Sequence, residues 1–160
     1  MGVSAAGKST VARLIAERIG ADFLDADDLH PAANRSKMSA GVPLDDDDRA
    51  PWLDRVAREI GFRGDAGVVI ACSALRRRYR DRIRAGAPGI RFVHLHGSEI
   101  LLAERAAART DHFMPSSLLA SQIATLELLD ADEDGVVLDV APAADAVAQA
   151  AVKWLDTRSS

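Results

Sequence analysis

The stretch Gly2-Val-Ser-Ala-Ala-Gly-Lys-Ser9 matches the pattern G-x-x-x-x-G-K-[ST] at every fixed position. In this pattern the glycines let the backbone curl so that successive N–H groups face a phosphate chain. The lysine, here Lys8, reaches the β- and γ-phosphates, and the hydroxyl, here of Ser9, coordinates Mg²⁺. Apolar residues at helical spacing predict a helix over 9–19, whose N-terminal N–H groups and dipole would attract the anion. The sequence therefore predicts a nucleoside triphosphate site at its start.

One part of the expected context of this loop is not in the sequence. A phosphate loop ordinarily follows a buried β-strand, and only Met1 precedes Gly2. We expect that the first strand is missing from this chain through a downstream choice of start codon. An upstream reading frame without an apolar run of strand length would contradict this expectation.

Size and composition are those of a globular protein. The chain has 160 residues, enough for one well-buried domain, and we expect residues 1–160 to form a single domain. A net charge of −4 argues against a nucleic-acid partner, and no apolar run approaches membrane-spanning length. The single cysteine, Cys72, excludes an internal disulfide and fits the reducing cytoplasm, where we expect the protein to act.

Short apolar runs alternate with helical patterns along the rest of the chain. Strands are predicted at 22–25, 67–72, 90–95 and 136–140. Helices are predicted at 9–19, 51–60, 75–83, 100–108, 118–129 and 143–155, and none is assigned to the polar segment 26–41. The run 67–72 is continuously apolar, as strands of a parallel sheet are. This alternation predicts an α/β fold with a parallel sheet and right-handed crossovers.

Acidic residues stand at the end of the predicted strand 22–25. Ligands of open α/β sheets bind beyond the carboxyl ends of the strands, so Asp25 and Asp27 should face the same crevice as the phosphate loop. One carboxylate would serve Mg²⁺ and the other would accept a proton from an attacking hydroxyl, as phosphoryl transfer requires. The competing interpretation is that Asp27 or Asp28 caps the next helix. The run 45–48 is interpreted as a charged helix start, because it lacks the spacing of a calcium-binding loop.

Six arginines lie between positions 76 and 84, on one predicted helix. A nucleic-acid patch is one interpretation. The apolar stripe Leu75, Tyr79 and Ile83 would instead dock the helix and leave most arginines in solvent. We favour this second interpretation, with one arginine turned into the site.

Taken together, these segments resemble the gluconate kinases (gluconokinases) among the P-loop small-molecule kinases. The resemblance is carried by the phosphate loop, by Phe23-Leu-Asp-Ala-Asp-Asp-Leu-His-Pro31, by the segments 43–53 and 72–81, and by His112-Phe113 and 122–127. It implies a three-layer α/β/α fold with strand order 2-3-1-4-5, and commonly a homodimer. It also implies ATP and Mg²⁺ as cofactors, and transfer of the γ-phosphate to the 6-hydroxyl of D-gluconate to give 6-phospho-D-gluconate.

The resemblance implies roles for individual residues. The catalytic residues would be Lys8, Asp27 and Arg109. Mg²⁺ would be held by Ser9 and Asp25. Gluconate would be bound by Asp27, His30, Arg49 and Arg80. ATP would be bound by Gly2, Val3, Ser4, Ala5, Ala6, Gly7, Lys8, Ser9, Thr10, Arg105 and Pro142. A lid is expected at about 109–116, around His112 and Phe113, although Asp111 stands where the family usually has glycine.

Two other functions remain open from the sequence. The first is another P-loop small-molecule kinase, for example one acting on shikimate, although this chain has Cys72-Ser73-Ala74 where shikimate-type enzymes carry a Gly-Gly-Gly turn. The second is a nucleotide-binding module without transfer chemistry, because a missing first strand would leave the phosphate loop poorly anchored.

Overall fold

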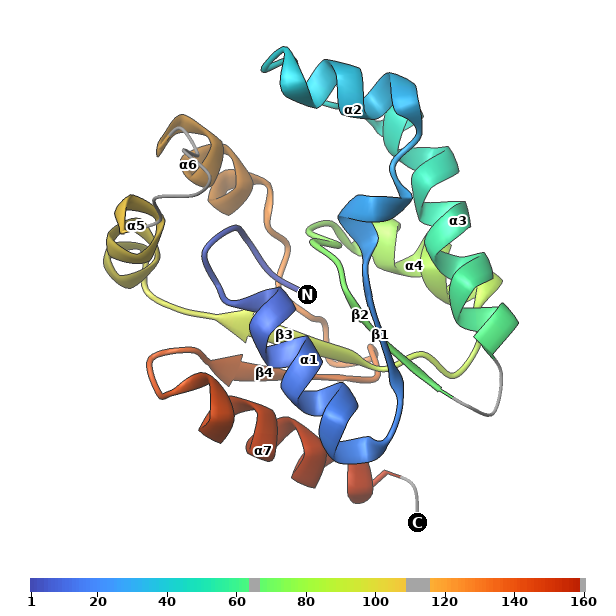
Figure 1. The fold of residues 1–160 in the computed structure, drawn as a ribbon, viewed down its shortest axis with the longest axis vertical. Coiled ribbons are helices and arrows are strands. Elements are labelled where there is room, and N and C mark those ends of the chain that lie inside the picture. Colours follow the sequence, from blue (N-terminus) through green and yellow to red (C-terminus); the bar gives the residue numbers. More distant parts are fainter. Residues whose placement is uncertain (64–66, 109–115, 159–160) are drawn as a thin grey trace.

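The computed structural model describes residues 1–63, 67–108 and 116–158 (Figure 1). Within these ranges, the elements follow in the order α1 (Lys8–Ile19), β1 (Asp22–Asp25), the 3₁₀ turn η1 (Ala26–Leu29), α2 (Ala32–Ser39), α3 (Asp46–Arg63), β2 (Val68–Ala71), α4 (Arg77–Gly86), β3 (Phe92–His96), α5 (Glu99–Ala107), α6 (Ser116–Thr125), β4 (Gly135–Asp139) and α7 (Ala144–Asp156). None of the helices in these ranges is both long and apolar enough to cross a membrane.

The described strands form two separate parallel pairs. β1 pairs with β2, with Asp25 opposite Ala71, and β3 pairs with β4. Met1 and Gly2 lie between the pairs: Leu95 of β3 donates its N–H to the Met1 carbonyl at 2.9 Å, and Gly2 donates its N–H to the Ser73 carbonyl at 3.1 Å. The chain start therefore occupies the position that the order 2-3-1-4-5 gives to the end of the first strand.

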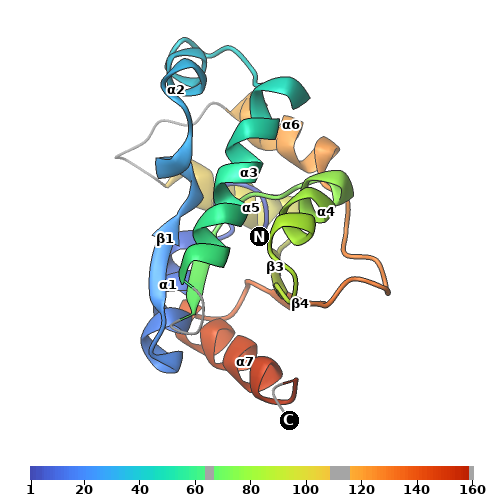
Figure 2. The ribbon, with the colours of Figure 1, turned by 90° about the vertical axis from the view of Figure 1, so that its right-hand side faces the viewer.

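Helices cover both faces of these strands. α1 and α7 pack against each other, and so do α3 and α4 (Figures 1 and 2). In β2, Val69 packs into the apolar cluster that contains Ile15 of α1, and the next residue, Ile70, packs into the cluster that contains Ile83 of α4. Because successive strand residues point to opposite faces, the two helix pairs lie on opposite sides. The predicted three-layer α/β fold with parallel strands is confirmed.

Two helices differ from the sequence prediction. α2 lies within the segment 26–41, to which no element was assigned, and α3 begins at Asp46, upstream of Pro51. Asp48 donates its N–H to the Asp45 carboxylate at 2.8 Å, and Asp45 donates its N–H to the Asp48 carboxylate at 3.2 Å. This reciprocal cap starts the helix early. The interpretation of 45–48 as a charged helix start is confirmed.

Candidate active site

The phosphate loop has the curled backbone that its glycines predict. Gly7 has φ 83° and Ala5 has φ 63°, both in the left-handed region. At Gly2 a Cβ would lie 2.6 Å from the Leu95 carbonyl oxygen, so only glycine fits there. α1 begins directly after Gly7, and no side chain caps that end in the described structure. Its first-turn N–H groups are therefore available to an anion, as in other phosphate sites at helix N-termini.

Two hydrogen-bond donors of the phosphate loop are bound to other groups of the protein in the structure. Lys8 donates from Nζ to the Val3 carbonyl at 3.0 Å. The N–H of Ser4 donates to Oε1 of Gln122, on α6, at 2.6 Å. Sequence reasoning did not assign Gln122 to the site, although its segment carried part of the family resemblance. Its contact joins α6 to the middle of the phosphate loop.

Ser9 and Asp25, the two predicted metal ligands, are in direct contact. Ser9 donates its hydroxyl to the Asp25 carboxylate at 2.7 Å. A hydroxyl and a carboxylate are the oxygen ligands that Mg²⁺ prefers, so this donor set fits the ion. No group of three or more His, Cys, Asp or Glu side chains that could hold a metal occurs among the described residues. Phosphate oxygens and water would therefore complete the coordination, as they commonly do for Mg²⁺.

Asp25 also caps the turn that carries Asp27. The N–H of Asp27 donates to the Asp25 carboxylate at 3.2 Å, and Asp25 is the N-cap of η1. The alternative that Asp27 or Asp28 is the cap of the next helix is wrong, because the N-cap of η1 is Asp25 and that of α2 is Pro31. Asp27 itself is exposed.

The environment of Asp27 suits a proton acceptor. Partial loss of hydration raises the pKa of the Asp27 carboxyl, the Asp25 charge raises it further, and the Lys8 charge opposes both. Asp27 adjoins the Ser9–Asp25 pair, since its own N–H donates to the same Asp25 side chain that Ser9 contacts. A carboxylate whose pKa is raised toward the working pH is a better base than an ordinary surface aspartate.

His30, at the end of η1, is buried against neighbouring side chains. It is 3% exposed and stacks on Trp52 with ring centroids 4.3 Å apart. Trp52 is itself held by its indole N–H, which donates to the Ala26 carbonyl at 2.7 Å, and the Asn34 amide contacts Nδ1 of His30 at 3.3 Å. Burial lowers the pKa of His30 to about 4, with help from the Arg49 charge. The imidazole is therefore neutral near pH 7.

Arg49 places a positive charge close enough to His30 to lower the pKa of the imidazole. Its guanidinium lies 5.7 Å from the centre of the Tyr79 ring, and it forms no ion pair with any other residue in the described ranges. The neighbouring Asp46 is instead bound by Tyr79, whose hydroxyl donates at 2.5 Å, and by Arg78. The half-buried guanidinium of Arg49 can therefore meet an anionic ligand.

Arg80 does not belong to this group, and its prediction as a substrate ligand needs correction. Its side chain is 0% exposed and donates to both carboxylate oxygens of Glu133, at 2.7 and 2.6 Å. Its remaining donors contact backbone carbonyls, including those of Glu127 and Leu128 at 3.0 Å. Burial alone would raise the pKa of Glu133, but hydrogen bonds led by that from Arg80 lower it to about 2. The buried Arg80 side chain therefore holds the chain segment between α6 and β4 in place through its hydrogen bonds.

The two residues predicted to flank adenine meet beside the phosphate loop. Arg105 donates from Nη2 to the Val140 carbonyl at 2.8 Å. A cavity of about 280 Å³ is lined by Arg105, Val140 and Pro142 on one side and by loop and α1 residues on the other. Its position next to Gly7 fits a nucleoside whose phosphates enter the loop. Arg109, His112 and Phe113 lie outside the described residues, so the predicted lid over about 109–116 stays a prediction.

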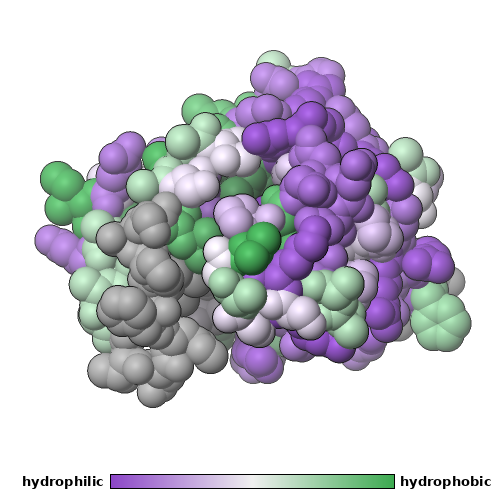
Figure 3. Space-filling view, turned by 90° about the horizontal axis from the view of Figure 1, so that it is seen from above, coloured by the Kyte–Doolittle hydropathy of each residue, from purple (hydrophilic) through white to green (hydrophobic). Residues whose placement is uncertain are grey.

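The end of the molecule that carries the loop is hollowed. Seen from above, hydrophilic side chains cover the side that carries α2 and α3, next to a central depression (Figure 3). A polar crevice wall of this kind suits a hydroxylated ligand, whose groups require hydrogen-bond partners once they leave water.

Comparisons with known proteins agree on the family. A family model described as an AAA domain matches residues 1–129. A gluconokinase of Gluconobacter oxydans (strain 621H) is 49% identical over 137 residues, covering 83% of this chain and 76% of that protein. The thermosensitive gluconokinase of Escherichia coli (strain K12) is 42% identical over 140 residues, covering 86% and 74%. The crystal structure of a gluconokinase from Sinorhizobium meliloti 1021 has 48% identity and a TM-score of 0.90, covering 99% of this chain and 90% of that one. Because this identity extends over most of its length, the chain belongs to the gluconokinase family.

Proposed function

We propose that this protein transfers the γ-phosphate of ATP to the 6-hydroxyl of D-gluconate and so forms 6-phospho-D-gluconate and ADP. The observation that supports the proposal is the surroundings of Asp27: its N–H donates to the Asp25 carboxylate that Ser9 also contacts, and the Lys8 charge acts on its carboxyl. The family membership supplies the acceptor, since the relatives described above are named gluconokinases.

On the nucleotide side, the backbone N–H groups from Gly2 to Thr10 would cradle the phosphates. Arg105 and Pro142 would hold the adenine ring in the cavity beside Gly7. Ser9 and Asp25 fit Mg²⁺, which when bound neutralises charge on the phosphates. Lys8 would leave the Val3 carbonyl for the β- and γ-phosphates, and Gln122 would release the N–H of Ser4.

In the transfer itself, Asp27 would accept the proton of the 6-hydroxyl as that oxygen bonds to the γ-phosphorus. The bond between the γ-phosphorus and the β–γ bridging oxygen breaks, and ADP carries away that oxygen with its electron pair. Lys8 would stabilise the charge that develops on the phosphoryl oxygens. Arg109 stays a prediction for the same task.

On the acceptor side, Arg49 and His30 would select a sugar acid. A guanidinium binds a carboxylate through two parallel hydrogen bonds, and the guanidinium of Arg49 has no carboxylate partner among the described residues. His30 is neutral near pH 7, so it offers one donor and one acceptor to hydroxyl groups. With the carboxylate at Arg49, the 6-hydroxyl at the far end of gluconate would point toward Asp27.

A coupled ADP-release assay tests the proposal directly. Purified protein is given ATP and Mg²⁺ with D-gluconate, shikimate or a nucleoside monophosphate as the acceptor. We expect turnover with gluconate alone. Turnover with shikimate or a nucleotide would overturn the choice of acceptor, whereas tight binding of ATP without turnover on any acceptor would favour a nucleotide-binding module.

Two further properties stay predictions based on the family. We expect a homodimer, which light scattering coupled to size exclusion measures. We expect action in the cytoplasm, which imaging of a tagged protein in the native cell measures.

A further inference from the structure

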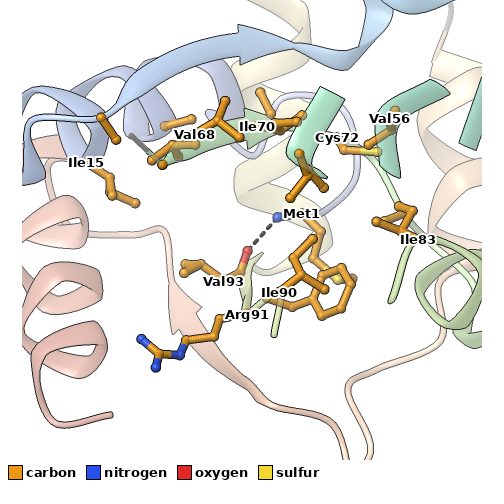
Figure 4. A pocket seen from close by; sticks show the side chains of 18 of the residues that line it. Met1, Ile15, Val56, Val68, Ile70, Cys72, Ile83, Ile90, Arg91 and Val93 are labelled. Atoms are coloured by element: carbon orange, nitrogen blue, oxygen red, sulfur yellow. Dashed lines mark hydrogen bonds between the residues drawn. The ribbon is translucent and has the colours of Figure 1, made fainter. Parts of the chain in front are cut away.

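The large cavity between β2 and β3 offers little to a hydroxylated ligand. It has a volume of about 430 Å³, and its walls are mainly apolar side chains such as Ile15, Val56 and Ile83 (Figure 4). Two buried polar side chains lie elsewhere, at the start of α2. They are His30 and Asn34, each 3% exposed, and they contact each other. His30 is already assigned to the acceptor side, whereas Asn34 has no role in the proposed mechanism.

The Asn34 side chain is held in one orientation by α3. Its amide nitrogen donates to the Asp48 carbonyl at 2.7 Å. A carbonyl oxygen only accepts hydrogen bonds, so the NH₂ group of the amide must face Asp48 and cannot exchange places with the amide oxygen. Asp48 lies in the first turn of α3, where its reciprocal cap with Asp45 fixes the backbone. The position of the amide nitrogen therefore follows from the start of α3.

The same NH₂ group determines which nitrogen of His30 carries the proton. It lies 3.3 Å from Nδ1 of His30, and it has a second hydrogen that Asp48 does not use. A group that only donates requires an acceptor, so Nδ1 of the ring is unprotonated. Burial lowers the pKa of His30 to about 4, so the ring is neutral near pH 7 and has a single N–H. That N–H is at Nε2.

Nε2 is the ring nitrogen that a ligand can reach. It forms no hydrogen bond with the described residues, and it is not among their buried polar atoms that lack a partner, so part of it is exposed. The ring is held by its stacking on Trp52. The backbone of His30 is held as well, because its N–H donates to the Asp27 carbonyl at 3.3 Å and its carbonyl accepts from Arg35 at 2.5 Å. His30 therefore presents one donor in a fixed direction.

The charged groups around the ring favour the same protonation state. Arg49, on α3, and Arg35, on α2, are the charges that act on the imidazole, and both lower its pKa. In the described part of the chain, no carboxylate is among these influences. A carboxylate is the kind of partner that would draw the proton to Nδ1.

We propose that Asn34 is a positioning residue that fixes the proton of His30 on Nε2, so that His30 donates a hydrogen bond to an oxygen of gluconate and cannot take up a proton from it. The inference rests on the proposed function and divides the work of the acceptor side. Of the donor and the acceptor that a neutral imidazole has, only the donor is left for the ligand, because Asn34 occupies the acceptor. The Asp27 carboxylate then remains the proton acceptor for the 6-hydroxyl.

Nitrogen NMR of the unmodified protein tests the position of the proton without any substrate. In protein labelled with ¹⁵N on its histidines, a protonated and an unprotonated ring nitrogen have well-separated shifts. The chain has four histidines, so a sample of the His30→Gln variant identifies the signals of His30. Near pH 8 we expect a protonated Nε2 and an unprotonated Nδ1. A proton on Nδ1, or an even mixture of the two tautomers, overturns the proposal.

Asn34→Asp replaces the donor beside Nδ1 with an acceptor and nearly keeps the shape. We expect the ring proton to move to Nδ1, so that the lone pair of Nε2 faces an oxygen of gluconate. KM for gluconate should rise by roughly tenfold or more, whereas kcat should change by less than about threefold and KM for ATP should stay the same. The new carboxylate also raises the pKa of His30, so spectra and kinetics are recorded near pH 8, where the ring is neutral.

Lys37→Met is the matched control on the same helix. Lys37 pairs with the Asp48 carboxylate at 2.6 Å, so this substitution also weakens the contact between α2 and α3 but leaves the Asn34 amide in place. We expect the ring proton to stay on Nε2. A shift of the proton in Lys37→Met, or a normal KM for gluconate in Asn34→Asp, overturns the proposal. Absence of gluconate turnover in the unmodified protein contradicts the proposed function and with it the ligand named here, whereas the ring proton is measured independently.

Discussion

The nucleotide side and the acceptor side that we propose for this crevice are built in different ways. The nucleotide side consists mainly of backbone groups from eight consecutive residues, Gly2 to Ser9, shaped by left-handed φ angles. The acceptor side consists of side chains from separate elements: Asp27 on η1, His30 after it, and Arg49 on α3. Trp52 binds these pieces together by its stacking on His30 and its bond to Ala26. A local motif therefore fixes which donor is used, whereas tertiary packing fixes which acceptor is used.

The largest expected effect is at the point where the two sides meet. Asp27→Asn removes the proton acceptor and keeps the shape, so we expect kcat to fall by roughly 10²–10⁴ while the Kd for ATP is unchanged. ADP release gives kcat and calorimetry gives Kd. Asp28→Asn, on the same turn, is the matched control and should keep normal turnover. Normal turnover in Asp27→Asn would remove Asp27 from the mechanism.

The second prediction tests whether Arg80 has a structural role and belongs to neither the nucleotide side nor the acceptor side. Arg80→Met removes the buried two-pronged partner of Glu133, which keeps only its contacts with Arg84 and the Asp130 N–H, so we expect a loss of about 3 kcal/mol in the free energy of unfolding. Denaturant melts measure the loss. Arg82→Met breaks only an exposed pair with Asp54, so we expect it to cost about 0–1 kcal/mol. An increase in KM for gluconate at unchanged stability would return Arg80 to the acceptor side.

The third prediction is that one substitution changes KM for gluconate but not KM for ATP. Arg49→Met removes the charge that we assign to the gluconate carboxylate, so KM for gluconate should rise by roughly 10–100-fold while KM for ATP stays the same. Steady-state kinetics with each substrate varied in turn measure both values. Arg78→Met, whose side chain pairs with Asp46, is the control. Equal increases in both KM values would contradict the division into two sides.

The smallest effect concerns the anchoring of the nucleotide side by Met1. The unfolded amine binds a proton below pH 8, whereas the folded one, with a pKa of about 5, does not. Stability should therefore fall as pH falls from 8 toward 5, by up to about 1.4 kcal/mol per pH unit. The charged and titratable groups near the amine are Cys72, Lys8 and Arg80.

Denaturant melts at pH 6.5–8 measure this dependence, with an N-terminally acetylated chain as the control. The buried imidazoles of His30 and His94, each with a pKa lowered to about 4, have the same sign but act below pH 6.5. The acetylated form should show a flatter profile across the window. A flat profile in the unmodified chain would show that the amine is solvated in the native state.

The parts of this protein that were predictable are those whose signal is local. The phosphate loop, the apolar run 67–72 and the acidic end of the strand 22–25 each carry their chemistry within a few consecutive residues. The early start of α3 also has a local signal, the reciprocal cap of Asp45 and Asp48. Pro51 instead suggested a later start, because proline favours the first turn of a helix.

The parts that were not predictable depend on residues far apart in sequence. The helix 77–86 has several arginines, and Arg80 is the buried one because the distant Glu133 and the carbonyls of Glu127 and Leu128 surround its guanidinium. Gln122 meets Ser4 across more than a hundred residues, and no periodicity or spacing signals that contact. Such pairings are decided by tertiary packing, which local patterns do not encode.

The bond between Gln122 and Ser4 has a consequence for the order of events in the crevice. A single N–H cannot serve two strong acceptors at full strength, so a phosphate oxygen that takes this donor must evict the glutamine carbonyl. A nucleotide phosphate bound at Ser4 would therefore displace the Gln122 side chain of α6. Gln122 would thus compete with a phosphate oxygen for the N–H of Ser4, and its side chain would be released once phosphate is bound.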